Sequence, residues 1–296
     1  MQWRQPIAEI QQQVTEDYFR QSICLYDRAK HGNEMMVASG SHSYPFSVAV
    51  PLQVPSSLRG RYGSIDYVAI ATLERLWQPN ETVSKAMKIT SVLDLNTLPY
   101  HVLEPMESHK AQRCGFMCFC SGDICATLRL SRAAFIPGEV IRLNGEVANN
   151  CGLRLKRTSF QLIQTVSCHD EYGRSSVDEH SVALVEKVEG VPSGSVEFWR
   201  EQMKVPTVPP SGQKYCNAMD LGYSLRFTAS TFFSPVAMEM DIEIVIGTVA
   251  LNEPENIETN FYGEYFTSSY PDFNSTGSAS PITGSDNSGL DLTYFI

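Results

Sequence analysis

The stretch that decides the fold is Ser121–Asn150, SGDICATLRLSRAAFIPGEVIRLNGEVANN. Apolar residues alternate with polar ones from Ile124 to Leu130, and the alternation resumes from Ile141 to Val147. Because successive side chains of a strand point to opposite faces, each run predicts a half-buried strand. Pro137 and Gly138 lie between the runs, and this pair favours a turn in which glycine takes a positive φ. We therefore expect two strands with one face packed and the other in water.

The same alternation returns in other parts of the chain. Strands are expected over 65–73, 85–95, 158–169, 182–187, 221–228 and 238–246. Many short strands separated by turn signals favour an all-β fold built from antiparallel sandwiches. The segment 101–117 contains histidines and charges without a sustained period, so it is predicted to be a linker.

An internal repeat relates the two halves of the chain. Each copy contains a Val-Pro segment, then a segment that ends in tyrosine, and the copy itself ends near a Leu-Asn pair. In the first copy these are Val54–Ser57, Ser64–Tyr67 and Leu95–Asn96. In the second copy they are Val208–Ser211, Asp220–Tyr223 and Leu251–Asn252. Two related immunoglobulin-like sandwiches in tandem explain this repeat. The first copy has about 34 fewer residues before its proline, enough for several strands, so we expect the first sandwich to be incomplete.

The net charge of −10 argues against a nucleic-acid binder, which needs a basic surface. Seven of the 33 acidic residues and none of the 23 basic ones lie after residue 250. The segment 253–296 is also rich in Ser, Gly and Asn, and it is predicted to be an acidic, disordered tail. No apolar run of ~18 residues indicates a transmembrane segment, and no signal peptide is visible. We therefore expect a cytoplasmic protein whose eight cysteines are reduced thiols.

Seven short stretches carry a resemblance to a known family. They are GSHSYPF (40–46), VPSS (54–57), GSIDY (63–67), CFCSGDI (118–124), FIPGE (135–139), VPPS (208–211) and IGTV (246–249). In this order and spacing they resemble the arrestin family, specifically the arrestin domain-containing proteins (α-arrestins), over about residues 30–251. The resemblance implies a partial N-like sandwich at 1–100, the linker at 101–117 and a C-like sandwich at 118–252. The strands that open the family's N-domain are absent here.

The resemblance also implies a function. It predicts a non-enzymatic adaptor that links membrane receptors or transporters, as cargo, to endocytic trafficking and ubiquitination machinery at the plasma membrane or endosomes. Contacts would be made by strand edges, loops and the tail. The family's tails usually carry PPxY motifs that recruit ubiquitin ligases, but this tail offers only SYPDF at 269–273. A retromer-type coat subunit and a truncated protein with little activity are the alternatives.

Two groups of residues are candidate partner-binding sites. Arg154, Lys156 and Arg157 alternate partly on one face just before a predicted strand, where they would meet phosphates of a partner or of lipid headgroups. A solvated strand edge that carries cations against aggregation is the alternative. Tyr270 and Phe273 in the tail form either a short linear motif or isolated aromatics in a disordered segment.

Neither catalysis nor cofactor binding is expected. Cys114, Cys118, Cys120 and Cys125 lack the paired C-x2-C spacing of strong zinc sites, so buried thiols are the favoured interpretation and no metal is predicted. Cys168-His169-Asp170 has the residue types of a catalytic triad, but neighbours on one strand point to opposite faces and cannot form a relay.

Overall fold

The computed structural model describes residues 14–26, 40–74, 78–115 and 121–252. The chain divides into two units, one of residues 1–20 and 51–251 and the other of 21–50 and 252–296. All helices and strands of the described residues lie in the first unit. In the second unit the described residues form neither, and Tyr44 contacts Tyr26 with the ring centroids 6.0 Å apart.

The described residues are almost all β, as predicted. The strands are β1 (Leu58–Arg59), β2 (Ser64–Ile65), β3 (Tyr67–Leu73), β4 (Glu81–Met87), β5 (Met106–Gly115), β6 (Ser121–Leu130), β7 (Ala134–Phe135), β8 (Val140–Asn149), β9 (Leu155–His169), β10 (Ser175–Lys187), β11 (Ser195–Lys204), β12 (Met219–Thr231) and β13 (Met238–Ile246). The helices are a 3-10 turn at Leu95–Thr97 and α1 at Tyr100–Leu103. Neither helix in the described ranges is long and apolar enough to cross a membrane.

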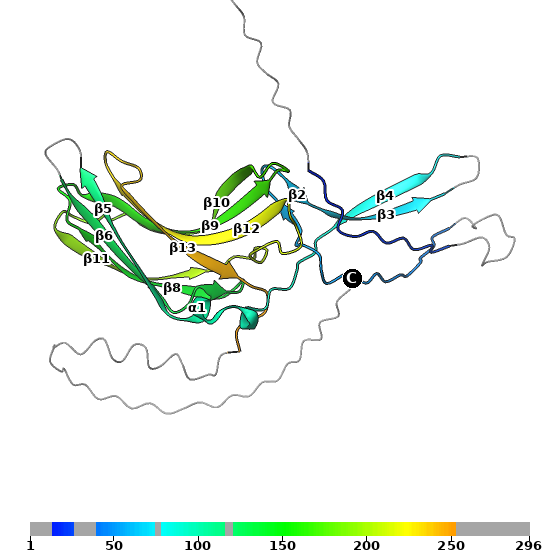
Figure 1. Cartoon of the computed structure of the whole chain (residues 1–296), viewed down its shortest axis with the longest axis horizontal. Coiled ribbons are helices and arrows are strands. Elements are labelled where there is room, and N and C mark those ends of the chain that lie inside the picture. The colour runs from blue at the N-terminus through cyan, green and yellow to red at the C-terminus, as the bar shows by residue number, and fades with distance from the viewer. Residues whose placement is uncertain (1–13, 27–39, 75–77, 116–120, 253–296) are drawn as a thin grey trace, which may run out of the picture. The chain divides into compact units, whose positions relative to one another are not determined.

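Two sheets form the sandwich of the second half (Figure 1). One has the strand order β10-β9-β12-β13-β7 and the other the order β11-β8-β6-β5. In β12 every second residue from Met219 to Thr231 is buried, which is the pattern of a strand with one face in the core. Between the sheets, the ring of Phe160 lies 4.8 Å from that of Trp199 on β11 and 5.0 Å from that of Phe227 on β12, measured between centroids.

The prediction for Ser121–Asn150 is confirmed. β6 and β8 pair antiparallel, from Ile124 opposite Asn149 to Arg129 opposite Asn144. Gly138 takes φ +94° in the connection, as expected for the Pro-Gly turn. The short strand β7 lies in the same connection and pairs with β13 of the other sheet, so this connection ties the two layers together.

The predicted linker at 101–117 is wrong over most of its length. β5 occupies Met106–Gly115 and pairs with β6 along all ten residues. Met106 and Cys114 at the two ends of β5 face the core, but the inward positions between them are polar: Ser108 Oγ lies 3.6 Å from Met240 Sδ, and Lys110 Nζ donates to Glu239 O at 2.5 Å. Because β5 is the outermost strand of its sheet, these side chains reach solvent and need not be apolar. The apolar alternation that marks a strand is therefore missing from the sequence.

The internal repeat has a structural counterpart at two tyrosines. Tyr67 Oη donates to Pro55 O at 2.7 Å, and Tyr223 Oη donates to Pro209 O at 2.8 Å. Both phenols are buried, at 7% and 4% exposed. Each hydrogen bond joins the tyrosine to the Val-Pro segment of its own copy, so the repeat preserves a side-chain contact and not only a spacing.

Burial raises the pKa of Tyr67 to about 12, with a further contribution from nearby Cys216. An unfolded tyrosine ionises near pH 10, so the folded state holds this proton more tightly and its contribution to stability is lost as pH rises from about 10 to 12. We expect Tyr67→Phe to lower the free energy of unfolding at pH 8 by about 1 kcal/mol, because Pro55 O loses its donor. The difference from wild type should shrink between pH 10 and 12 in urea unfolding monitored by circular dichroism. Tyr172→Phe, at a side chain that is 70% exposed, is the control and should follow wild type at every pH.

The ends of the two repeats lie side by side. Asp94 and Val249 form a parallel bridge, Leu95 N donates to Val249 O at 3.3 Å, and Asn96 Nδ2 donates to Ala250 O at 2.9 Å. Leu95 is fully buried, and a Cβ on Gly247 would lie 2.4 Å from its Cδ2. The glycine therefore permits the close approach that buries this leucine.

The first half forms two small sheets in the described residues, and the incomplete first sandwich stays a prediction. β1 pairs with β2, and their buried residues Leu58 and Ile65 join the hydrophobic core of the second half. β3 and β4 form a separate two-stranded sheet.

Candidate partner-binding site

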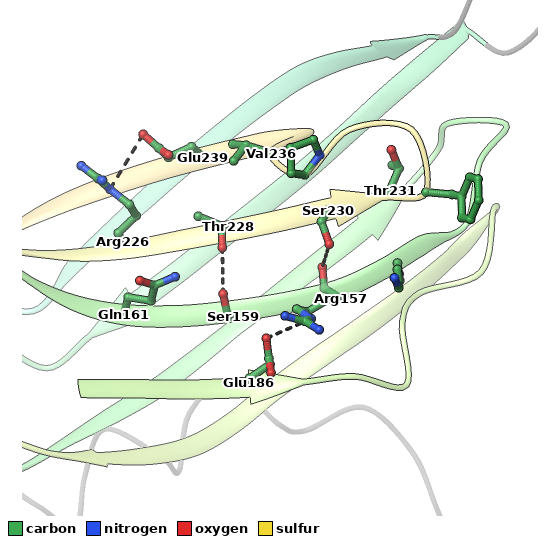
Figure 2. A pocket seen from close by; sticks show the side chains of 13 residues that line it. Arg157, Ser159, Gln161, Glu186, Arg226, Thr228, Ser230, Thr231, Val236 and Glu239 are labelled. Atoms are coloured by element: carbon green, nitrogen blue, oxygen red, sulfur yellow. Dashed lines mark hydrogen bonds and ion pairs between the residues drawn. The ribbon is translucent and has the colours of Figure 1, made fainter. Parts of the chain in front are cut away.

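A groove of about 560 Å³ lies on the outer face of the five-stranded sheet (Figure 2). It runs along β9 and β12 and ends at the connection between β12 and β13. Basic, acidic, hydroxyl and apolar side chains all line it: Lys156, Arg157, Ser159, Gln161, Glu186, Arg226, Thr228, Ser230, Thr231, Phe232, Pro235, Val236 and Glu239. It contains two of the cations that the sequence singled out.

A β-bulge brings these two cations into one groove. Arg157 is paired with Ser230 of β12, but the next pair joins Leu155 to Thr231, which leaves Lys156 as an extra residue on β9. In a regular strand, neighbours would point to opposite faces, whereas a bulge bends the strand and redirects a side chain. Lys156 and Arg157 can therefore both line the same surface.

The two cations differ in their partners. Arg157 Nε lies 3.0 Å from Glu186 Oε1, and this arginine side chain is 51% exposed. Lys156 is exposed and has no hydrogen-bond or ion-pair partner within the described part of the chain. An ammonium group with no counter-charge is available to an anion from outside the molecule.

The floor of the groove next to these cations consists of hydroxyl groups. Ser159 Oγ and Thr228 Oγ1 lie 2.7 Å apart on neighbouring strands, and Ser230 Oγ donates to Arg157 O at 3.4 Å (Figure 2). Hydroxyls both donate and accept, so they can turn their protons toward a bound oxygen.

Acidic side chains surround the third cation, Arg226, at the other end of the groove. Its guanidinium lies 2.8 Å from Asp241 Oδ1, 2.9 Å from Glu179 Oε2 and 3.8 Å from Glu239 Oε1. Hydrogen bonds to Asp241 and then to Glu179 hold the pKa of Arg226 above its usual value. Its charge is therefore already compensated, and only the Lys156 end of the groove attracts anions.

An apolar rim borders the cationic end. Phe232 is 82% exposed and Val236 is 52% exposed, both in the connection between β12 and β13. Sequence reasoning missed this part of the site. The signal was present as Phe232-Phe233 directly before Ser234-Pro235, because two adjacent aromatics in a turn have no core to enter.

The other predicted site residues lie elsewhere. The guanidinium of Arg154 donates to Glu189 O at 2.5 Å and does not line the groove. Tyr270 and Phe273 lie outside the described residues, as does the whole predicted tail from 253. The structure thus brings together Lys156 and Arg157 and leaves Arg154 apart.

The structure gives the surroundings of Cys114, from the cysteine cluster, and of Asp170, from the Cys168-His169-Asp170 segment. Cys114 is buried on β5, where burial and contact with Cys151 raise its pKa to about 11, whereas Cys118 and Cys120 lie outside the described residues. Asp170 Oδ1 accepts from the backbone of Tyr172 and Arg174, which closes the turn between β9 and β10. No group of three or more His, Cys, Asp or Glu in the described ranges is placed to hold a metal ion.

Comparison with known proteins places both halves in one family. Residues 4–96 match the family described as arrestin (or S-antigen), N-terminal domain, and residues 120–251 match arrestin (or S-antigen), C-terminal domain. Mouse arrestin domain-containing protein 4 is 30% identical over 237 residues, which cover 79% of this chain and 55% of that protein. Arrestin domain-containing protein 17 of Caenorhabditis elegans is 28% identical over 224 residues, 73% of this chain and 50% of that protein.

Mouse arrestin domain-containing protein 1 is 25% identical over 241 residues, 81% of this chain and 52% of that protein. The chain thus spans about half the length of the curated relatives it matches. The N-terminal domain match covers the first copy of the internal repeat, and the C-terminal domain match covers the second. With its antiparallel sheets and its matches to both arrestin domains, the chain belongs to the arrestin family.

Proposed function

We propose that this protein is a non-enzymatic, cytoplasmic adaptor that links membrane receptors or transporters to endocytic trafficking and ubiquitination machinery. It would act at the plasma membrane or on endosomes. The family supports the adaptor role, and the groove beside Lys156 and Arg157 is the observation that carries the proposal. We place cargo recognition there and recruitment of other proteins in the tail, including Tyr270 and Phe273.

The chemistry of the groove suits a phosphate group on the partner. Lysine and arginine bind phosphate oxygens through charge-assisted hydrogen bonds, and the hydrogen-bonded pair of Ser159 and Thr228 hydroxyls has one further proton to donate beside them. Phe232 and Val236 would cover apolar residues that flank the phosphate. Because Lys156 has no counter-charge among the described residues, a bound phosphate does not first have to displace an internal ion pair there.

The test is proximity labelling in cells with the charge-reversed variant Lys156→Glu/Arg157→Glu. We expect labelling of receptors and transporters to fall by about tenfold, because loss of two phosphate contacts costs at least ~1.4 kcal/mol. Arg129→Glu/Lys204→Glu makes the same change in charge on the other sheet and should label like wild type. Unchanged cargo labelling by the groove variant would exclude the site.

A deletion of 253–296 separates the two roles. The deletion should remove ubiquitin ligases and trafficking proteins from the labelled set while cargo remains. Capture of a stoichiometric coat complex instead of receptors or ligases would favour a retromer-type subunit. If neither variant changes the labelled set, the adaptor proposal is wrong.

A further inference from the structure

Three sulfur atoms lie together at one end of the five-stranded sheet, away from the groove. Cys168, near the end of β9, is opposite Met219, the first residue of β12. A Cβ on Gly63 would lie 3.5 Å from Cys168 Sγ and 3.1 Å from Met219 Sδ, so both sulfurs lie against the same glycine. The third sulfur belongs to Cys216, which accepts a hydrogen bond from Met219 N at 3.2 Å. Two thiols and one thioether therefore gather around Met219.

The two cysteines belong to one site. Burial, with smaller electrostatic effects of Cys216 and Asp178, raises the pKa of Cys168, so the two thiols are close enough to interact. Both are free and half-buried, which lets an ion from solvent reach them, whereas Met219 is 6% exposed. No third His, Cys, Asp or Glu of the described residues joins the two thiols. Sulfur atoms are therefore the side-chain ligands that this part of the chain offers.

A hydrogen-bond donor reaches the sulfur of Cys216 from a distant part of the chain. Tyr18 Oη lies 3.0 Å from Cys216 Sγ and 3.1 Å from Glu16 Oε2. The single phenolic proton can go to either acceptor, and negative charge on the sulfur would draw it to Cys216. Together with Met219 N, the sulfur then faces two donors. Donors aimed at a ligand sulfur stabilise its negative, metal-binding form and fix its orientation.

The kind of ligand decides which ion fits. Zinc in structural sites takes four ligands in a tetrahedron, and calcium and magnesium take oxygen. Thiolate and thioether sulfurs are soft ligands that select Cu(I). The spacing Cys-x-x-Met at 216–219 supplies one of each from a single short segment, and Cys168 adds the second thiol from the neighbouring strand. Three sulfurs therefore fit Cu(I) better than zinc.

We propose that Cys168, Cys216 and Met219 form a binding site for Cu(I), in which Tyr18 donates a hydrogen bond to Cys216 Sγ. The ion bonds to the two thiolate sulfurs and to the thioether, the two S–H protons are released to solvent, and no electron is transferred. The ligands come from the second copy of the internal repeat, whereas Gly63, which packs on two of them, comes from the first. A bound ion therefore stabilises the contact between the two copies.

The test is anaerobic titration of the reduced full chain with the coloured complex of Cu(I) and bicinchoninate. The wild-type chain should take Cu(I) from the dye and release two protons for each ion bound at this site. Met219→Leu keeps the side-chain volume and should lower the affinity by about tenfold or more, and Cys168→Ser/Cys216→Ser should abolish this binding. Circular dichroism recorded before copper is added shows whether each variant is folded.

Tyr18→Phe tests the hydrogen bond to the ligand sulfur. It keeps the aromatic ring and removes only the donor, so it should lower the affinity by about tenfold without changing the number of ions bound. An affinity equal to that of wild type would show that Tyr18 does not act on Cys216.

Cys118→Ser/Cys120→Ser is the matched control, because it removes two thiols in another part of the sequence. It should leave the affinity unchanged. A wild-type chain that takes up no Cu(I) overturns the proposal, and so does uptake that the control abolishes or that Met219→Leu and Cys168→Ser/Cys216→Ser leave unchanged. X-ray absorption at the copper edge gives a second criterion: it should show sulfur ligands alone, and nitrogen or oxygen ligands would place the ion elsewhere.

Discussion

Phe160→Ala is expected to lower the free energy of unfolding by about 3–5 kcal/mol, the usual range for deletion of a buried phenyl ring. Phe160 is 2% exposed and contacts aromatic rings in both sheets. Its edge-to-face contact with Trp199 joins the five-stranded sheet to the four-stranded one, at an interplanar angle of 84°. Alanine would leave a cavity where the two layers meet, and both remaining rings would lose packing partners.

Chemical denaturation followed by far-UV circular dichroism measures this loss. Phe198→Ala is the matched control, because Phe198 precedes Trp199 on β11 but points outward and is 57% exposed. We expect Phe198→Ala to change stability by less than about 1 kcal/mol. Equal losses from the two variants would mean that the sandwich core does not lie between these sheets.

Gly190→Ala is expected to destabilise the protein by about 3–4 kcal/mol, through two separate effects. Gly190 has φ +70°, which an alanine adopts only with strain. An added Cβ would also lie 2.2 Å from Leu155 O and 3.0 Å from Lys156 O. The backbone would have to move, although Leu155 and Val191 hold it there through two hydrogen bonds of 2.9 and 3.0 Å.

Gly194→Ala separates the two effects. Gly194 has nearly the same backbone conformation, φ +73°, but nothing lies within 4 Å of an added Cβ. Its substitution should cost only the strain of the left-handed conformation, about 1 kcal/mol. Because Gly190 packs against the backbone of Lys156, Gly190→Ala should also weaken cargo binding at the groove, whereas Gly194→Ala should not. Equal unfolding free energies for the two variants would show that Gly190 does not make this close contact.

The central strands of the sandwich could be predicted from the sequence, and the two outer strands of its four-stranded sheet could not. β6, β12 and β13 have neighbours on both sides and bury every second side chain, so their sequences alternate clearly. β5 and β11 are the two outer strands of the four-stranded sheet, and no strand was expected at either position. Their inward positions reach the open sides of the sandwich, where Lys110 and Glu197 are tolerated, and so the period of two is lost.

The candidate site shows the same division. Clustered basic residues pointed to Lys156 and Arg157 from the sequence alone. Arg154 lies apart from the groove, whereas the other two cations share it because of the bulge opposite Thr231. This bulge is a property of strand pairing and leaves no mark in the sequence of β9. Phe232 likewise lines the groove because of where the fold places the connection between β12 and β13.

The pairing of residues 93–96 with 248–250 has a consequence for how the protein is made. A ribosome adds about 5–20 residues per second, so the partner that covers Leu95 is synthesised on the order of 10–30 s after it, given a separation of 155 residues between Leu93 and Thr248. During that interval the nascent first half cannot close its own core. It would be a natural client for chaperones that shield apolar surface until translation reaches Ala250.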